Sequence, residues 1–182
     1  MPCLGGDVDS GDRRSPPIPS EERRCQHARY DLSKARGDLA NAATYYNAVN
    51  VDLSPFAARG GKLIIWHGWA DPALNALASI RYFQKAQARS KAVAANLRLF
   101  MLPGVVHCAG GTGPDRADWP RVIADWVEGG KAPGRVIASK MGADSKPTRT
   151  RPLCPYPEVE AWSGTGSTDS EENFACRAPR RK

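Results

Sequence analysis

The sequence has no long hydrophobic run. Its most marked apolar stretches are the four residues Leu63–Trp66 and the six residues Leu97–Leu102, the second interrupted by Arg98. A membrane-spanning helix needs about 20 mostly apolar residues, so no span is predicted and no membrane partner is expected. The first residues, Met1–Arg24, are polar and rich in proline and charge, and they contain no apolar core of a signal peptide.

The chain also lacks a concentrated excess of one charge. Its net charge is +7, and the basic residues are spread along it. The last residues, 177–182, form a basic tail with Arg177, Arg180, Arg181 and Lys182, but no aromatic residues alternate with them. Nucleic-acid partners are recognised by basic patches on a defined element, so none is predicted here.

Metal-binding and phosphate-binding patterns are missing as well. The three histidines and five cysteines nowhere show the spacing of zinc ligands. The glycine-rich stretch Ala109–Pro114 lacks the Lys-Ser/Thr pair of a P-loop. These residues therefore predict no metal and no cofactor, and the stretch is interpreted as a flexible loop.

The two apolar stretches favour a parallel β-sheet. Short apolar runs followed by turn residues are typical of buried strands, and the sequence between them, Leu74–Ala95, is predicted to be helical. Strand, helix and strand make a parallel pair with a right-handed crossover. The fold class is therefore α/β.

Asp71 and His107 follow these two strands, 36 positions apart (107 − 71). In open α/β sheets, working residues lie beyond the carboxyl ends of the strands. A neutral imidazole takes a proton from a serine hydroxyl near pH 7, and a carboxylate fixes its tautomer. Either residue alone is more often a turn residue or a structural histidine; together, at matching strand ends, they predict a catalytic acid and base. His67 is assigned to the wall of the site or to its support.

The remaining segments are less regular. Residues 1–50 are predicted to be poorly ordered up to Arg24 and weakly helical beyond it. Asp118–Glu128 is an amphipathic helix whose inward residues are expected to be Trp119, Ile123, Trp126 and Val127. Residues 132–176 are interpreted as a loop-rich tail with one strand in "APGRVIASK" and a second at Val159–Trp162.

Two motifs, "GGKLIIWHGWADP" and "LPGVVHCAGGTGP", resemble the C-terminal part of the tannase/feruloyl esterase family of serine hydrolases. The resemblance covers residues 51–176. It implies the C-terminal part of an α/β-hydrolase fold and a carboxylic ester hydrolase that acts on phenolic acid esters. It further implies that Asp71 is the triad acid and His107 the base.

The cysteines acquire roles from the same resemblance. In the family, the cysteine beside the catalytic histidine, here Cys108, is bonded to a cysteine beside the nucleophilic serine, which is absent here. Cys154 and Cys176 match a disulfide that pins the tail. Pairing of Cys108 with Cys3 or Cys25 stays open. Disulfides imply an extracytoplasmic or secreted enzyme, and the family's calcium site is expected in a lid domain outside these residues.

One family motif is missing. The nucleophile elbow, Gly-Cys-Ser-x-Gly-Gly, does not occur in residues 1–60, although such a strained turn requires its glycines. The chain is therefore expected to be such an esterase without its nucleophile, or an inactive truncated remnant or gene-model fragment. A subunit that completes a site on another chain is less favoured, because splitting a sheet exposes strand edges. Gallate, feruloyl and terephthalate esters all stay open as substrates, and the substrate-binding residues are unknown.

Overall fold

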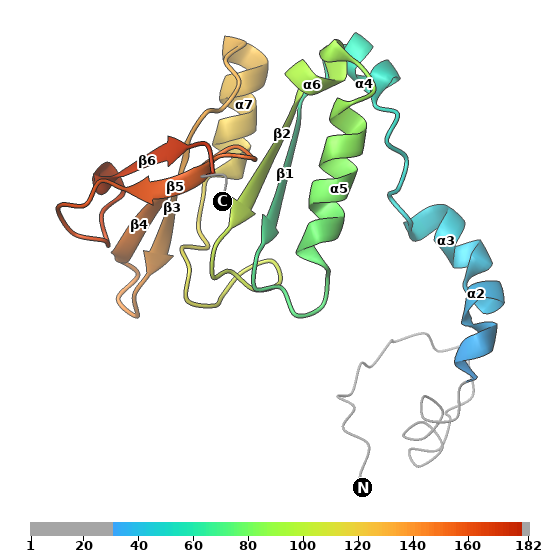
Figure 1. The fold of residues 1–182 in the computed structure, drawn as a ribbon, viewed down its shortest axis with the longest axis horizontal. Helices are drawn as coiled ribbons and strands as arrows, with labels where there is room; N and C mark the ends of the chain where they lie inside the picture. Colours follow the sequence, from blue (N-terminus) through green and yellow to red (C-terminus); the bar gives the residue numbers. More distant parts are fainter. Residues whose placement is uncertain (1–30, 180–182) are drawn as a thin grey trace, which may run out of the picture. The chain divides into compact units, whose positions relative to one another are not determined.

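The computed structural model describes residues 31–179 (Figure 1), and the chain divides into two units, Met1–Ala48 and Val49–Lys182, which are described separately. The first unit contains η2 (Leu32–Lys34), α2 (Ala35–Asp38) and α3 (Ala40–Tyr46), none of which buries a residue. These helices lie within the stretch from Cys25 to Asn50 that was predicted to be weakly helical, of which residues 25–30 lie outside the described range. The disorder predicted up to Arg24, and residues 180–182 of the basic tail, lie outside the described residues.

The second unit is built on the parallel pair β1 (Leu63–Gly68) and β2 (Leu97–Leu102). Their register runs from Leu63 opposite Leu97 to Gly68 opposite Leu102. Both strands therefore end level with each other, and the loops that follow them start at the same edge of the sheet. The predicted α/β class and the strand pair are confirmed.

The crossover between β1 and β2 contains two helices, α5 (Ala76–Gln87) and α6 (Lys91–Ala95), so the predicted helical stretch Leu74–Ala95 is present but interrupted. The break is at Ser90, whose backbone is extended and whose hydroxyl accepts a hydrogen bond from the Val93 amide at 3.1 Å. A serine in this role starts a new helix rather than continuing the old one. Asn75 caps the start of α5 in the same way.

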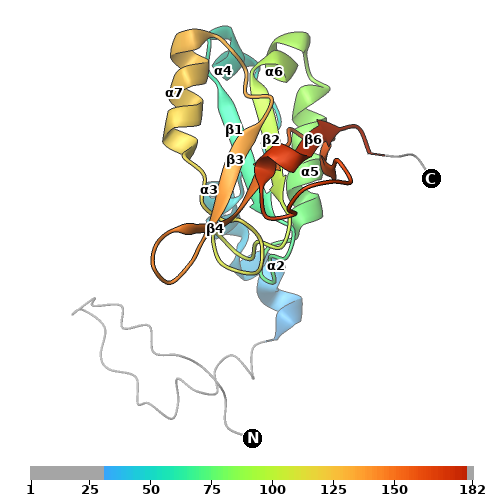
Figure 2. The ribbon, with the colours of Figure 1, turned by 90° about the vertical axis from the view of Figure 1, so that its left-hand side faces the viewer.

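Helices cover both faces of the strand pair, with α5 on one side and α7 (Trp119–Gly129) on the other (Figure 2). Alternate residues of β2 point to opposite faces, as the pleat requires. Leu97, Leu99 and Met101 pack with α5, α6 and α4 (Ser54–Ala58), whereas Phe100 and Leu102 pack with the start of α7 and the tail strands. β2 is thus buried between two apolar layers, one on each face.

Trp126 anchors α7 to the sheet. It is 1% exposed, and both the Lys62 ammonium and the Arg98 guanidinium lie over its ring, at 5.7 and 5.2 Å from the centroid. Val127 was expected to point inward, but it is 59% exposed. Val122, four residues before Trp126, packs against the core instead, because positions i and i+4 lie on the same helix face.

The tail contains more strand than expected. β3 (Val136–Met141) and β4 (Pro147–Leu153) form an antiparallel hairpin. β5 (Val159–Trp162) and β6 (Phe174–Arg177), separated by η3 (Glu171–Asn173), form a second antiparallel pair. The segment of β4 had been interpreted as loop, while the expected strands in "APGRVIASK" and at Val159–Trp162 are present.

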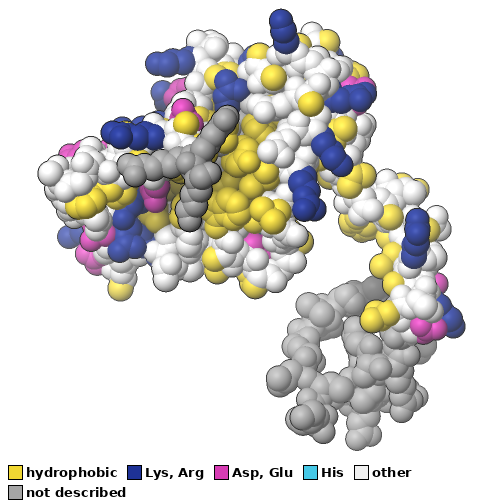
Figure 3. All heavy atoms as spheres, viewed as in Figure 1, with side chains coloured by type: hydrophobic (Ala, Val, Ile, Leu, Met, Phe, Trp, Pro, Cys, Tyr) yellow, Lys and Arg dark blue, Asp and Glu magenta, His cyan; other side chains and the backbone are white. Residues whose placement is uncertain are grey.

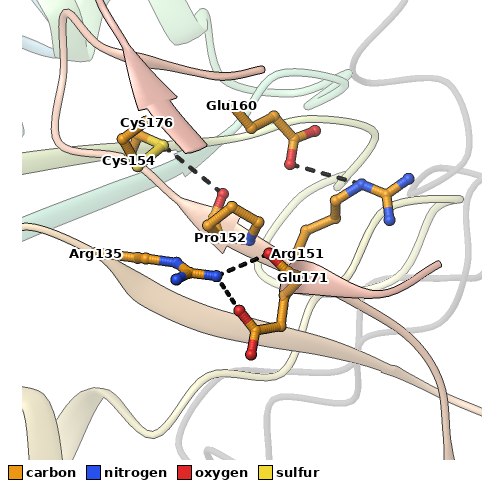
Figure 4. Close-up of a disulfide and its surroundings, with 7 residues drawn as sticks. All are labelled: Arg135, Arg151, Pro152, Cys154, Glu160, Glu171 and Cys176. Atoms are coloured by element: carbon orange, nitrogen blue, oxygen red, sulfur yellow. Dashed lines mark hydrogen bonds and ion pairs between the residues drawn. A yellow bond between two sulfur atoms is a disulfide. The ribbon is translucent and has the colours of Figure 1, made fainter. Parts of the chain in front are cut away.

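The tail is closed by the disulfide between Cys154 and Cys176, which confirms that pairing (Figure 4). Two ion pairs lie beside it: Arg151 with Glu160 at 3.7 Å, and Arg135 with Glu171. Figure 3 shows apolar side chains gathered between the tail strands and α5. Within residues 31–179, no helix is long and apolar enough to cross a bilayer.

Candidate active site

The acid of the candidate site stands in the turn after β1. Asp71 is placed by the backbone, because the amides of Trp69 and Ala70 donate to the carbonyls of Leu102 and Val105 at 2.9 and 3.0 Å. These bonds tie the loop after β1 to the loop after β2. The Asp71 side chain is only 3% exposed and projects toward the second loop.

Every strong contact of the Asp71 carboxylate favours its ionised form. One oxygen, Oδ1, accepts hydrogen bonds from the amides of Ala73 and Leu74 at 2.8 and 2.9 Å. The other, Oδ2, lies 2.9 Å from Nδ1 of His107. The Leu74 amide and the His107 ring hold the pKa of Asp71 well below its usual range. The group therefore stays an acceptor throughout the pH range in which an imidazole exchanges protons.

This ionisation fixes the proton on His107. A carboxylate can only accept, so Nδ1 of His107 must carry hydrogen and donate it. In the neutral ring, Nε2 is then the free basic nitrogen, and it makes no hydrogen bond with any residue in 31–179. The His107 side chain is 50% exposed. The pair thus presents an oriented, accessible base supported by a buried carboxylate, which is the arrangement that general-base catalysis requires.

The sequence-predicted residues meet as expected: Asp71 and His107 lie side by side at the ends of neighbouring parallel strands. Cys108 follows His107 as an exposed free thiol. The two cysteines proposed as its alternative partners, Cys3 and Cys25, lie outside the described residues.

His67, the third residue of the site, lies between the Asp71 carboxylate and helix α5. Its Nε2 lies 3.2 Å from Oδ2 of Asp71, and its Nδ1 lies 2.7 Å from the hydroxyl of Ser79 on α5. The Nε2 contact is short, but its geometry is not that of a hydrogen bond. Because Asp71 is ionised, the favourable tautomer carries hydrogen on Nε2, and Ser79 then donates to Nδ1.

Sequence reasoning missed Ser79. It is 12 residues from His67, and no local motif joins the two. The signal available was its position on the helix face that also carries the buried Ile80 and Phe83, where a polar residue needs a partner on the sheet.

A Ser79→Ala substitution tests this support. It leaves Nδ1 of the largely buried His67 ring without its donor, which costs about 1 kcal/mol of unfolding free energy. Urea unfolding measures the change. Ser163→Ala, at an exposed loop serine, is the control and is expected to stay within about 0.5 kcal/mol of the parent. Equal stability of the Ser79→Ala chain and its parent would contradict the contact.

Within residues 31–179, no group of three or more His, Cys, Asp or Glu side chains is placed to hold an ion. These residues therefore do not themselves fit the calcium ion that the family resemblance places in a lid domain.

A parallel strand pair with a helical crossover, and an acid and a histidine at its carboxyl edge, are the arrangement of the α/β-hydrolase fold. The solved structures agree. Feruloyl esterase B from Aspergillus oryzae superimposes with a TM-score of 0.68 at 28% identity, over 82% of this chain and 34% of that one. A tannin acyl hydrolase from Aspergillus niger gives a TM-score of 0.63 at 27% identity, over 79% and 27%.

The chain belongs to the tannase and feruloyl esterase family, whose sequence model matches residues 14–177. That match begins upstream of Val51, where the resemblance had been placed. A mono(2-hydroxyethyl) terephthalate hydrolase from Piscinibacter sakaiensis is 42% identical over 137 residues, which are 74% of this chain and 23% of that protein. A probable feruloyl esterase from Arthroderma benhamiae is 38% identical over 133 residues, 70% and 25% respectively. The chain therefore spans about a quarter of the length of these relatives.

Proposed function

We propose that residues 49–177 provide the acid and the base of a carboxylic ester hydrolase acting on esters of phenolic acids. The observation that carries the proposal is the 2.9 Å contact between the buried Asp71 carboxylate and Nδ1 of the exposed His107 ring. Family membership supports the reaction class, and the similarity to a mono(2-hydroxyethyl) terephthalate hydrolase and a probable feruloyl esterase supports aromatic esters as substrates.

The geometry of Asp71 and His107 supports the following path for the proton. Nε2 of His107 takes the proton of a serine hydroxyl as its oxygen attacks the ester carbonyl carbon. The imidazolium that results is stabilised by Asp71 and returns the proton to the departing alcohol, which leaves an acyl-enzyme. Water, deprotonated by the same nitrogen, then releases the acid and restores the serine. Asp71 stays ionised throughout.

The serine itself is the open part of the proposal. No cysteine in the sequence is followed by serine, so the family's nucleophile motif is not among these 182 residues. Between residues 31 and 179, no serine hydrogen-bonds to the His107 ring. We propose that Cys108 marks the side of His107 at which the nucleophile and its neighbouring cysteine would stand. The disulfide of the tail supports an extracytoplasmic location.

A second candidate is an inactive chain that keeps the family's acid and base but performs no turnover. The absence of a Cys-Ser pair favours it. The two candidates differ in a simple measurement on the purified chain. Hydrolysis of a chromogenic ester above the background rate, lost on His107→Ala, supports an enzyme, and a background rate supports the inactive chain.

A chimera tests the proposed roles independently of the nucleophile. Residues 49–177 replace the aligned segment of feruloyl esterase B from Aspergillus oryzae, and hydrolysis of methyl ferulate, propyl gallate and mono(2-hydroxyethyl) terephthalate is followed. Measurable turnover of at least one ester is expected, because Asp71 and His107 would then face a complete site. A folded chimera that hydrolyses none of them would contradict the assignment of Asp71 and His107.

A further inference from the structure

His107 stands on an unusual turn. The Ala109 amide donates to the His107 carbonyl at 2.7 Å, which closes a three-residue turn around Cys108. Cys108 has φ of +61°, in the left-handed region that residues other than glycine rarely adopt. Such a conformation persists where the surroundings hold it in place. The turn therefore needs an external support.

The two residues Gly110 and Gly111, which follow this turn, are held on both sides. The Val106 amide donates to the Gly110 carbonyl at 3.3 Å, across the turn. On the other side, the Gly110 amide donates to Oδ2 of Asp115 at 2.7 Å. Gly111 cannot carry a side chain, because a Cβ there would overlap the Gly104 carbonyl. Gly110 and Gly111 thus lie between the loop after β2 and the Asp115 carboxylate, with contacts to both.

Asp115 is itself fixed to the tail hairpin. Its Oδ1 lies 3.4 Å from the ammonium of Lys140 on β3, and its side chain is 10% exposed. The next residue, Arg116, exchanges two backbone hydrogen bonds with Ser139, at 3.0 and 2.8 Å. Burial opposes ionisation of Asp115, but the Gly110 amide and Lys140 outweigh it and keep the pKa of Asp115 below its usual value. The acceptor that meets Gly110 is therefore a charged group with a defined position.

We propose that Asp115 is a positioning residue, which holds the His107–Cys108 turn through Gly110 so that the imidazole faces Asp71. The inference rests on the proposed function for its catalytic meaning. Asp115 contacts neither His107 nor Asp71 directly and acts through the backbone. Through Lys140, Asp115 also links the His107 turn to β3. The tail hairpin therefore helps to hold His107 in position.

The test follows the Nδ1 proton of His107 in the full chain, labelled with 15N-histidine. The chain has three histidines, so the ring signals can be assigned by single substitutions. In the parent, the proton donated to Asp71 is expected downfield and slow to exchange with water, and Asp71→Asn is expected to remove that signal. Asp115→Ala is expected to speed the exchange about tenfold, because the turn opens more often.

The controls separate positioning from stability. Asp125→Ala removes an exposed ion pair with Arg121 and is expected to leave the exchange unchanged. Asp115→Asn keeps an acceptor for Gly110 and is expected to restore most of the protection. If Asp115→Ala does not fold, Lys140→Met takes its place, because it removes one of the two partners of Asp115; a faster exchange is expected.

The outcomes are distinct. Exchange equal to the parent's in folded Asp115→Ala, or in Lys140→Met where that variant replaces it, overturns the positioning role and leaves the Asp71–His107 pair intact. Absence of the downfield proton in the parent overturns the pair itself and with it the positioning role. An inactive chimera contradicts the proposed function without changing the exchange result.

Discussion

Replacing His107 with alanine is expected to lower ester hydrolysis by the chimera about 10⁴-fold or more. Without this imidazole no exposed base remains beside Asp71, because the other ring there, His67, is largely buried and its Nδ1 is bonded to Ser79. Losses of this size accompany removal of the base from a serine hydrolase site. Initial rates with methyl ferulate at neutral pH measure the effect. Activity within tenfold of the parent chimera would exclude His107 as the base.

Asp71→Asn is the companion substitution. An amide in place of the carboxylate can present its NH₂ group to Nδ1, which favours the tautomer with hydrogen on Nε2, the wrong nitrogen for a base. A loss of about 10⁴-fold is expected from the wrong tautomer. Asp125→Asn, at the exposed ion pair on α7, is the matched control and is expected to keep full activity. A loss confined to His107→Ala would assign Asp71 a structural role only.

The pairing of these two residues was predictable because it depends on strand ends, which local sequence marks well. Leu63–Trp66 and Leu97–Leu102 are short, apolar and followed by turns, and a parallel pair places their ends at one edge. The order of acid and histidine then fixes which residues meet. The geometry of the Asp71–His107 contact follows from that topology and needs little tertiary detail.

Other features depend on partners distant in sequence and were not predictable. β4 is rich in arginine and threonine and contains Pro147 and Pro152, a composition typical of loops. It becomes a strand because β3 supplies the hydrogen bonds and Leu153 packs in the core. The support of His67 by Ser79, and of Gly110 by Asp115, is likewise visible only once the chain has folded.

The break in the helical stretch Leu74–Ala95 was not predicted, and the reason is local. The helical pattern of Leu74–Ala95 is continuous in apolar spacing, and the break at Ser90 is a competition between continuing a helix and capping a new one. Val127 illustrates a different limit. Its apolar side chain, next to Trp126, suggested a buried position. Successive helix residues are rotated by 100°, however, and this rotation turns Val127 toward solvent.

Gly68→Ala is expected to have the largest effect on the fold of the site. Gly68 ends β1 and is buried against the loop that carries His107. A Cβ there would lie 2.6 Å from the Val106 carbonyl oxygen and closer still to that of Val105. Val105 is fully buried, and its carbonyl accepts the Ala70 amide at 3.0 Å, so it cannot withdraw without breaking the link between the two loops.

We expect Gly68→Ala to lower the unfolding free energy by about 3 kcal/mol or more, at the upper end of overpacking substitutions. Urea unfolding measures this. Gly129→Ala is the matched control: a Cβ there meets nothing within 4 Å, and the change is expected to be neutral or to stabilise α7 by up to about 1 kcal/mol. The downfield Nδ1 proton of His107 should disappear in Gly68→Ala and persist in Gly129→Ala, because the methyl group separates the loops that bring acid and base together. A Gly68→Ala chain as stable as its parent, with that proton intact, would show that the two loops are not in direct contact.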